Sequence, residues 1–143
     1  LFRSDVERLD NPKDVHKLFK DVFGDASVEN LYAIYLDIKN QPTAISCIAK
    51  GTESATVFNQ KEMLKIALLS NASKMILAHN HPSGDLTPST QDVDVTYKIM
   101  AAGEMLGVEV LDHMIISKDD YISMREEEIV DFNPMDVVSR LEL

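Results

Sequence analysis

The sequence predicts an α/β fold in which a mixed sheet is flanked by helices. Segments with the apolar spacing of a helix alternate with short apolar runs, in the order helix, strands, helix, strand, helix, strands. Glycine, proline and other turn-forming residues separate these segments. The chain has 143 residues, of which 45% are apolar, and this is the size of one ordinary domain. We therefore expect a single domain over residues 1–143.

The first expected element is an amphipathic helix within the N-terminal region, residues 1–27. Asn11 suits the N-cap, Pro12 suits the first helical position, and Gly24 suits the end of the helix. Apolar residues then recur with helical spacing at Val15, Leu18, Phe19 and Val22.

Two strands should follow as an antiparallel hairpin. Residues 31–38 are apolar on both faces, which is typical of a strand inside a sheet. Residues 43–49 read as the partner strand, and Gly51 ends the pair. The lone Cys47 lies in this apolar run, so we expect it to be a small buried side chain in a protein from a reducing compartment.

The middle of the chain reads as a helix, a strand and another helix. Asn59 and Glu62 have the spacing of a capping box for the second helix. Residues 74–78 form a short buried strand, and the third helix runs from Ser89 to Gly107.

The C-terminal part reads as a second hairpin followed by an acidic tail. Residues 108–117 and 121–124 are the expected strands. The tail, residues 125–143, is expected to be solvated or mobile because three consecutive glutamates follow Arg125.

The overall charge narrows the possible partners. Twenty-four acidic and fourteen basic residues give a net charge of −10, which disfavours direct binding to nucleic acid. No apolar run approaches the ~18 residues of a membrane span, and no leader segment is visible. We expect a soluble, cytoplasmic protein without membrane contact, and the sequence leaves its oligomeric state open.

The stretch that follows the middle strand carries the chemistry. His79 and His81 stand two apart at a strand end, so both imidazoles project to the same side and can reach one ion. Asp92 falls in the first turn of the next helix, where its carboxylate can turn back toward them. Two nitrogens and one carboxylate suit Zn²⁺ and leave a fourth position for water, as in catalytic sites.

Each of these features also has an ordinary structural explanation. A strand-end histidine is usually a satisfied polar residue, and Asp92 three residues after Ser89 is what a capping box supplies. Gly84 and Pro88 are common turn residues. The combination in one short stretch nevertheless favours a metal site over these separate explanations.

This stretch resembles a known motif. The spacing His-x-His, seven residues, Ser, two residues, Asp is similar to the JAMM (MPN+/JAB) metalloprotease motif. The strings HNHPSGDLTPS and LDHMII resemble RadC proteins over roughly residues 28–123. The resemblance implies the cytidine deaminase-like α/β/α sandwich of JAB/MPN domains. It also implies that His79, His81 and Asp92 bind zinc as cofactor and that Ser89 supports the reaction intermediate.

The general base is the least defined member of the implied site. JAMM enzymes place a glutamate at the start of an early strand, and Glu29 occupies the matching place. A solvated carboxylate at a strand start is the other interpretation of Glu29, and Glu62 and Glu53 are alternative bases. His113 is either a paired strand histidine or a contact to a metal ligand or substrate.

The resemblance implies a zinc-dependent metallohydrolase that cleaves a peptide or isopeptide bond of a peptide or protein substrate through a zinc-activated water. The family name also carries a DNA repair label, so the alternative is a non-catalytic zinc-bound scaffold in repair or recombination. A zinc deaminase is excluded because it needs a Cys-x-x-Cys pair and the chain has one cysteine. Full-length RadC proteins carry an upstream helix-hairpin-helix region. None is visible here, so we expect either a trimmed chain or a shorter RadC-like protein.

Overall fold

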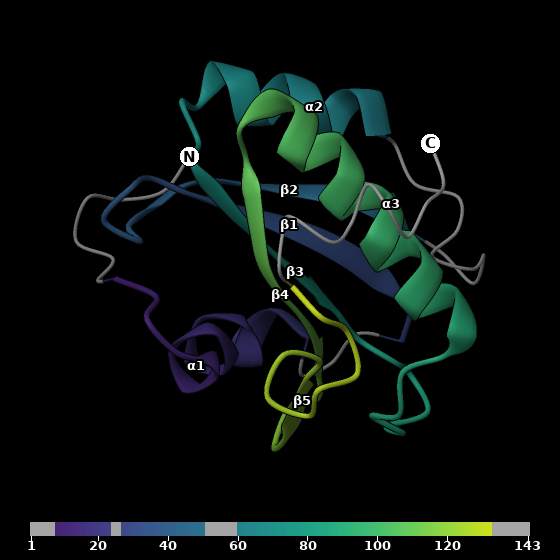
Figure 1. Cartoon of the computed structure of the whole chain (residues 1–143). Helices are drawn as coiled ribbons and strands as arrows, with labels where there is room; N and C mark the ends of the chain where they lie inside the picture. Colours follow the sequence, from purple (N-terminus) through teal and green to yellow (C-terminus); the bar gives the residue numbers. More distant parts are fainter. Residues whose placement is uncertain (1–7, 24–26, 51–59, 133–143) are drawn as a thin grey trace.

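A five-stranded mixed sheet organises the protein (Figure 1). The computed structural model describes residues 8–23, 27–50 and 60–132. The strand order is β2-β1-β3-β4-β5, and β3 and β4 pair in parallel while the other neighbours pair antiparallel. The strands are β1 (Asn30–Leu36), β2 (Pro42–Lys50), β3 (Lys74–His79), β4 (Glu109–Ile116) and β5 (Tyr121–Ser123). This confirms the predicted mixed sheet and the interior position of the first strand.

Helices cover both faces of the sheet and complete an α/β/α sandwich (Figure 1). α1 (Pro12–Phe23) lies on one face, whereas α2 (Gln60–Leu69) and α3 (Thr90–Leu106) lie on the other. A separate apolar core fills each interface, with Phe19 in the core beneath α1 and Ile99 in the core beneath α3. The predicted α/β class and its flanking helices are therefore confirmed. Among the described residues, no helix is both long and apolar enough to cross a membrane.

Local capping chemistry sets the helix ends that the sequence predicted. Asn11 Oδ1 accepts a hydrogen bond from the backbone of Asp14 at 3.1 Å, as an N-cap does. Ser89 caps α3, and Gly107 ends that helix in the left-handed region at φ 76°. The expected roles of Gly24, Gly51 and Asn59 fall on residues outside the described ranges.

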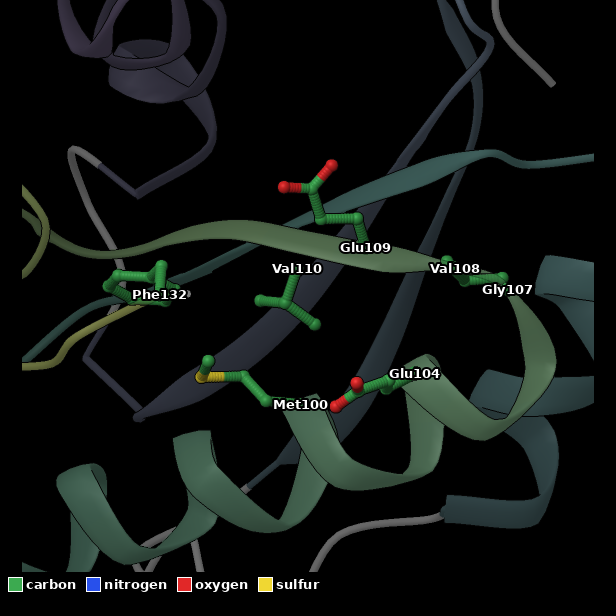
Figure 2. Close-up of a pocket in the computed structure, with 7 residues that line it drawn as sticks. All are labelled: Met100, Glu104, Gly107, Val108, Glu109, Val110 and Phe132. Atoms are coloured by element: carbon green, nitrogen blue, oxygen red, sulfur yellow. The ribbon is translucent and has the colours of Figure 1, made fainter. Parts of the chain in front are cut away.

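Two expectations about burial are wrong. Cys47 is exposed because β2 is an edge strand whose inward positions near it are taken by Ser46 and Ile48. In the tail, residues 125–129 are exposed as expected, but Val130 and Phe132 are buried in the core. Apolar side chains gain free energy by leaving water, which favours their place in the core. Phe132 also lines a pocket between α3 and β4 (Figure 2).

A buried tyrosine makes the stability of this fold sensitive to alkaline pH. The Tyr35 hydroxyl donates to the Met63 carbonyl at 3.1 Å and lies 2.8 Å from Ser46 Oγ. Burial raises the pKa of Tyr35 to about 12. An unfolded tyrosine has a pKa near 10, so as the pH rises the unfolded chain loses this proton before the folded protein does. The contribution of the protonated Tyr35 to the free energy of unfolding is therefore complete below pH 10 and is lost above it.

We expect this contribution, about 2 kcal/mol, to disappear as the pH rises from 10 to 12. Tyr35→Phe should unfold more easily than the parent at pH 8, by about 1 kcal/mol, because two hydrogen bonds are lost. The gap should close or reverse at pH 11.5. Urea midpoints at both pH values measure this, and an equal gap at both would contradict the assignment.

Candidate metal centre

The pairing of β1 with β3 brings the two halves of the candidate site together. These strands are antiparallel, and Leu31 lies opposite His79. The residues just before β1 therefore lie beside the residues just after β3. Glu29 and His81 meet at this edge, although 52 positions separate them in the sequence.

Asn80 connects the end of β3 to the residues just before β1 by hydrogen bonds. It is buried, its Oδ1 accepts from the Asn30 backbone N–H at 2.8 Å, and its Nδ2 donates to the Val28 carbonyl at 3.1 Å. Because these partners flank Glu29 on both sides, Asn80 fixes the backbone that carries the glutamate. No role for Asn80 followed from the sequence alone. The sequence feature that could have indicated a role for Asn80 is its position between two histidines at the end of a buried strand.

Three side chains at this edge could hold a metal ion. The Nε2 atoms of His79 and His81 lie 2.9 Å apart. Glu29 Oε1 lies 3.6 Å from His81 Nε2 and 3.9 Å from His79 Nε2. Their ligand atoms all lie within 4.8 Å of one another. This grouping brings together residues that the sequence placed in one site.

Asp92 reaches the same cluster from the first turn of α3. Its Oδ1 lies 3.3 Å from His79 Nε2 and its Oδ2 lies 3.3 Å from His81 Nε2. Its Oδ2 also accepts from the Ser89 backbone N–H at 2.8 Å, while Ser89 Oγ accepts from the Asp92 N–H at 3.0 Å. The capping box and the approach to the histidines are therefore compatible, because the same carboxylate does both.

The protonation pattern of the cluster fits a cation. His81 Nδ1 lies 2.6 Å from the carbonyl of Asp85, and a carbonyl only accepts, so the proton is on Nδ1 and the Nε2 lone pair faces the cluster. The ligand atoms of a tetrahedral site with ~2.0–2.2 Å bonds stand about 3.3–3.6 Å apart. The distances from the two Asp92 oxygens to the histidines and from Glu29 to His81 fall in this range, whereas the two histidine nitrogens lie closer together, at 2.9 Å. Imidazole nitrogen and carboxylate oxygen together suit a divalent transition metal.

Burial and hydrogen bonding act on the charges in opposite directions. Burial alone would raise the pKa of Asp92, but His79 and His81, which donate to this carboxylate when their imidazoles are protonated, outweigh it and hold that pKa well below the usual range. Asp92 accepts a hydrogen bond from the protonated form of His81 and so raises the pKa of His81, which burial partly opposes. Asp92 is therefore an ionised carboxylate, the form that binds metals.

The other residues singled out in the sequence lie around this centre. Ser89 is the exposed N-cap of α3. His113 is fully buried on β4, and burial holds its pKa well below the usual value; its Nε2 lies 2.7 Å from His79 Nδ1. Glu62 lies in the first turn of α2, where its charge acts on Tyr35. Glu53 falls outside the described residues.

Comparisons with known proteins identify the family of this chain. The family model for the RadC-like JAB domain matches residues 9–129. A UPF0758 protein from Finegoldia magna is 41% identical over 118 residues, which is 82% of this chain and 53% of the relative. A UPF0758 protein from Latilactobacillus sakei is 46% identical over 99 residues, covering 69% of this chain and 44% of the relative. A UPF0758 protein from Desulforamulus reducens is 39% identical over 119 residues, covering 83% and 52%.

The chain spans about half the length of these curated relatives. The match to the family model includes β1, β3 and α3, the elements that carry the clustered side chains. This chain therefore belongs to the family of RadC-like JAB domains.

Proposed function

We propose that this domain is a zinc-dependent hydrolase of the JAMM type that cleaves a peptide or isopeptide bond in a protein or peptide substrate. One observation carries the proposal. Two imidazole nitrogens and two carboxylates from three separate segments converge at the end of β3, with every histidine-to-carboxylate distance at or below 3.9 Å. Structural zinc sites usually use four protein ligands, whereas three ligands with a nearby carboxylate are typical of hydrolytic sites.

Distance and exposure assign the two carboxylates to different roles. Asp92 is nearer to both histidines, at 3.3 Å, and its side chain is 4% exposed, so we assign it to the metal together with His79 and His81. The Glu29 side chain is 23% exposed and lies at 3.6–3.9 Å from them. A general base must reach both the water and the substrate, and Glu29 has the position and exposure for this.

The reaction then follows from these roles. A bound Zn²⁺ would supply Lewis acidity, which polarises the scissile carbonyl and acidifies the attacking water. Glu29 accepts one proton from that water as the oxygen bonds to the carbonyl carbon. It returns the proton to the leaving nitrogen as the carbon–nitrogen bond breaks. The products are a carboxylic acid and an amine.

Ser89 is assigned to the developing oxyanion. Its Oγ accepts a hydrogen bond from the Asp92 backbone, so its own proton stays available to a second partner. A donor placed at the charge that develops in the transition state typically contributes 10²–10³-fold to the rate. This is the role that the resemblance to JAMM enzymes implies.

The test is hydrolysis by the zinc-loaded protein. The purified chain, supplied with one equivalent of Zn²⁺, is incubated with a peptide library and with isopeptide-linked peptides, and mass spectrometry detects the released fragments. We expect cleavage that EDTA abolishes and added Zn²⁺ restores. Stoichiometric zinc without any cleavage would instead favour the zinc-bound scaffold. The net charge of −10 opposes direct contact of either form with duplex DNA.

A further inference from the structure

A continuous chain of buried hydrogen bonds supports His79 from the side facing away from the candidate metal site. His113 Nε2 lies 2.7 Å from His79 Nδ1, and His113 Nδ1 lies 2.6 Å from Thr96 Oγ1. All three residues are 0% exposed. They come from β3, β4 and α3, so the chain crosses from the sheet to the helix that carries Asp92.

The direction of each hydrogen bond in this chain can be deduced. Thr96 Oγ1 lies 2.7 Å from the main-chain carbonyl of Asp92, which only accepts, so the single hydroxyl proton points there. Thr96 therefore accepts from His113 Nδ1–H. His113 Nε2 then carries a lone pair and accepts from His79 Nδ1–H.

The consequence appears at the other nitrogen of His79. With its proton on Nδ1, a neutral His79 has a lone pair on Nε2, the atom 3.3 Å from Asp92 and 2.9 Å from His81 Nε2. The opposite tautomer would point an N–H into the cluster and block a metal there. We propose that His113, held by Thr96, is a positioning residue that fixes the tautomer and ring orientation of His79 for metal binding.

The two histidines of the site are thus supported differently. His81 donates to a carbonyl in the exposed loop, at Asp85, whereas His79 donates to a buried imidazole. The imidazole adds no charge to the site, and through Thr96 it ties His79 to the backbone of Asp92. Two of the proposed ligands therefore share one hydrogen-bonded support.

The backbone at His113 is itself anchored. Asp112 Oδ1 accepts from the His113 N–H at 2.8 Å and from the Arg125 N–H at 3.0 Å, and Asp112 Oδ2 accepts from Ser123 Oγ at 2.5 Å. These bonds join β4 to the segment that leaves β5. They limit the movement of His113 away from His79, which a positioning role requires.

The first test reads the tautomer in the metal-free protein, so it does not depend on zinc. Long-range ¹H–¹⁵N NMR spectra at pH 8 distinguish Nδ1–H from Nε2–H in each imidazole. We expect His79 in the parent to carry its proton on Nδ1, and His113→Leu to show a mixture of both tautomers. His16→Gln, a change on α1, is the matched control and should leave the His79 signals unchanged.

The second test is zinc affinity, measured by competition with a chelator. This part rests on the proposed function, and we expect His113→Leu to weaken binding 10–100-fold, as the loss of such support typically does. His113→Gln, which can accept from His79 and donate to Thr96, should recover most of that loss. Thr96→Val should weaken zinc binding, and Thr96→Ser should restore it.

The outcomes separate the two proposals. A parent that binds no zinc but shows His79 Nδ1–H would overturn the proposed function and leave the tautomer assignment intact. The positioning role would be overturned if His79 in the parent carried its proton on Nε2. It would also be overturned if the His113→Leu variant folded and kept both the parental His79 tautomer and the parental zinc affinity. If His113→Leu fails to fold by circular dichroism, the Thr96→Val and Thr96→Ser pair decides: parental zinc affinity and tautomer in Thr96→Val overturn the role.

Discussion

Replacing Glu29 with glutamine is expected to lower the rate of amide hydrolysis about 10²–10⁴-fold while zinc stays bound. Glutamine keeps the size and the hydrogen-bonding capacity of the side chain but cannot accept a proton from water. The hydrogen bonds of Asn80 to the residues on both sides of Glu29 should preserve the backbone in the variant. The measurements are cleavage rate and zinc per chain by elemental analysis.

Glu62→Gln is the matched control for this prediction. Glu62 is also a partly buried glutamate, but it lies in the first turn of α2. Glu62 and Glu53 are the two alternative bases that the sequence leaves open, and a near-parental rate in Glu62→Gln removes the first of them. If Glu29→Gln kept the parental rate, Glu29 would not be the base. If it lost zinc, Glu29 would instead be a metal ligand, as its grouping with His79 and His81 allows.

Replacing Asp92 with asparagine is expected to weaken zinc binding more than about 100-fold. This loss exceeds the 10–100-fold that typically follows when a residue hydrogen-bonded to a metal ligand is removed. The change removes the anionic oxygen that lies 3.3 Å from His79 and leaves the site with one fewer charge. Asparagine still offers one oxygen to the Ser89 N–H, so the cap of α3 should survive. The thermal midpoint of the metal-free protein should therefore change much less than the zinc affinity.

Asp94→Asn tests the specificity of that effect. Asp94 is exposed and lies two residues further along α3, so its removal changes the net charge of the protein equally. We expect the Asp94 variant to bind zinc like the parent in the same chelator competition. Equal affinity losses in both variants would mean that overall charge, and not coordination by Asp92, holds the ion.

The local parts of the structure were predictable because their causes are local. The N-cap Ser89 and the left-handed Gly107 define α3 within a few residues of sequence. The pairing of His79 with His81 follows from strand geometry, and the reach of Asp92 follows from its place in the first turn of the next helix. Such features need no knowledge of the tertiary fold.

Features that depend on strand register were harder to predict. Glu29 was assigned by resemblance, and its position beside the histidines requires the antiparallel register of β1 on β3. The bond between His79 and His113 spans 34 positions and depends on the parallel pairing of β3 with β4. Asn80 and Thr96 could be understood only after their backbone partners were known.

The errors have the same origin. The apolar run around Cys47 is typical of a buried strand, but β2 lies at the edge of the sheet and Cys47 is exposed. The sequence does not show which strands pair with β2. The acidic composition after Arg125 masked two apolar side chains, Val130 and Phe132, which a charge count overlooks. In both cases the deciding information was which surface the segment packs against.

The most direct test of the account is diffraction at the zinc absorption edge from crystals of the zinc-loaded protein. We expect one anomalous peak about 2.0–2.2 Å from His79 Nε2, His81 Nε2 and an Asp92 carboxylate oxygen. Glu29 should stand outside the coordination sphere, within hydrogen-bond reach of the fourth position. A peak elsewhere, no peak, or coordination by Glu29 in place of Asp92 would contradict it.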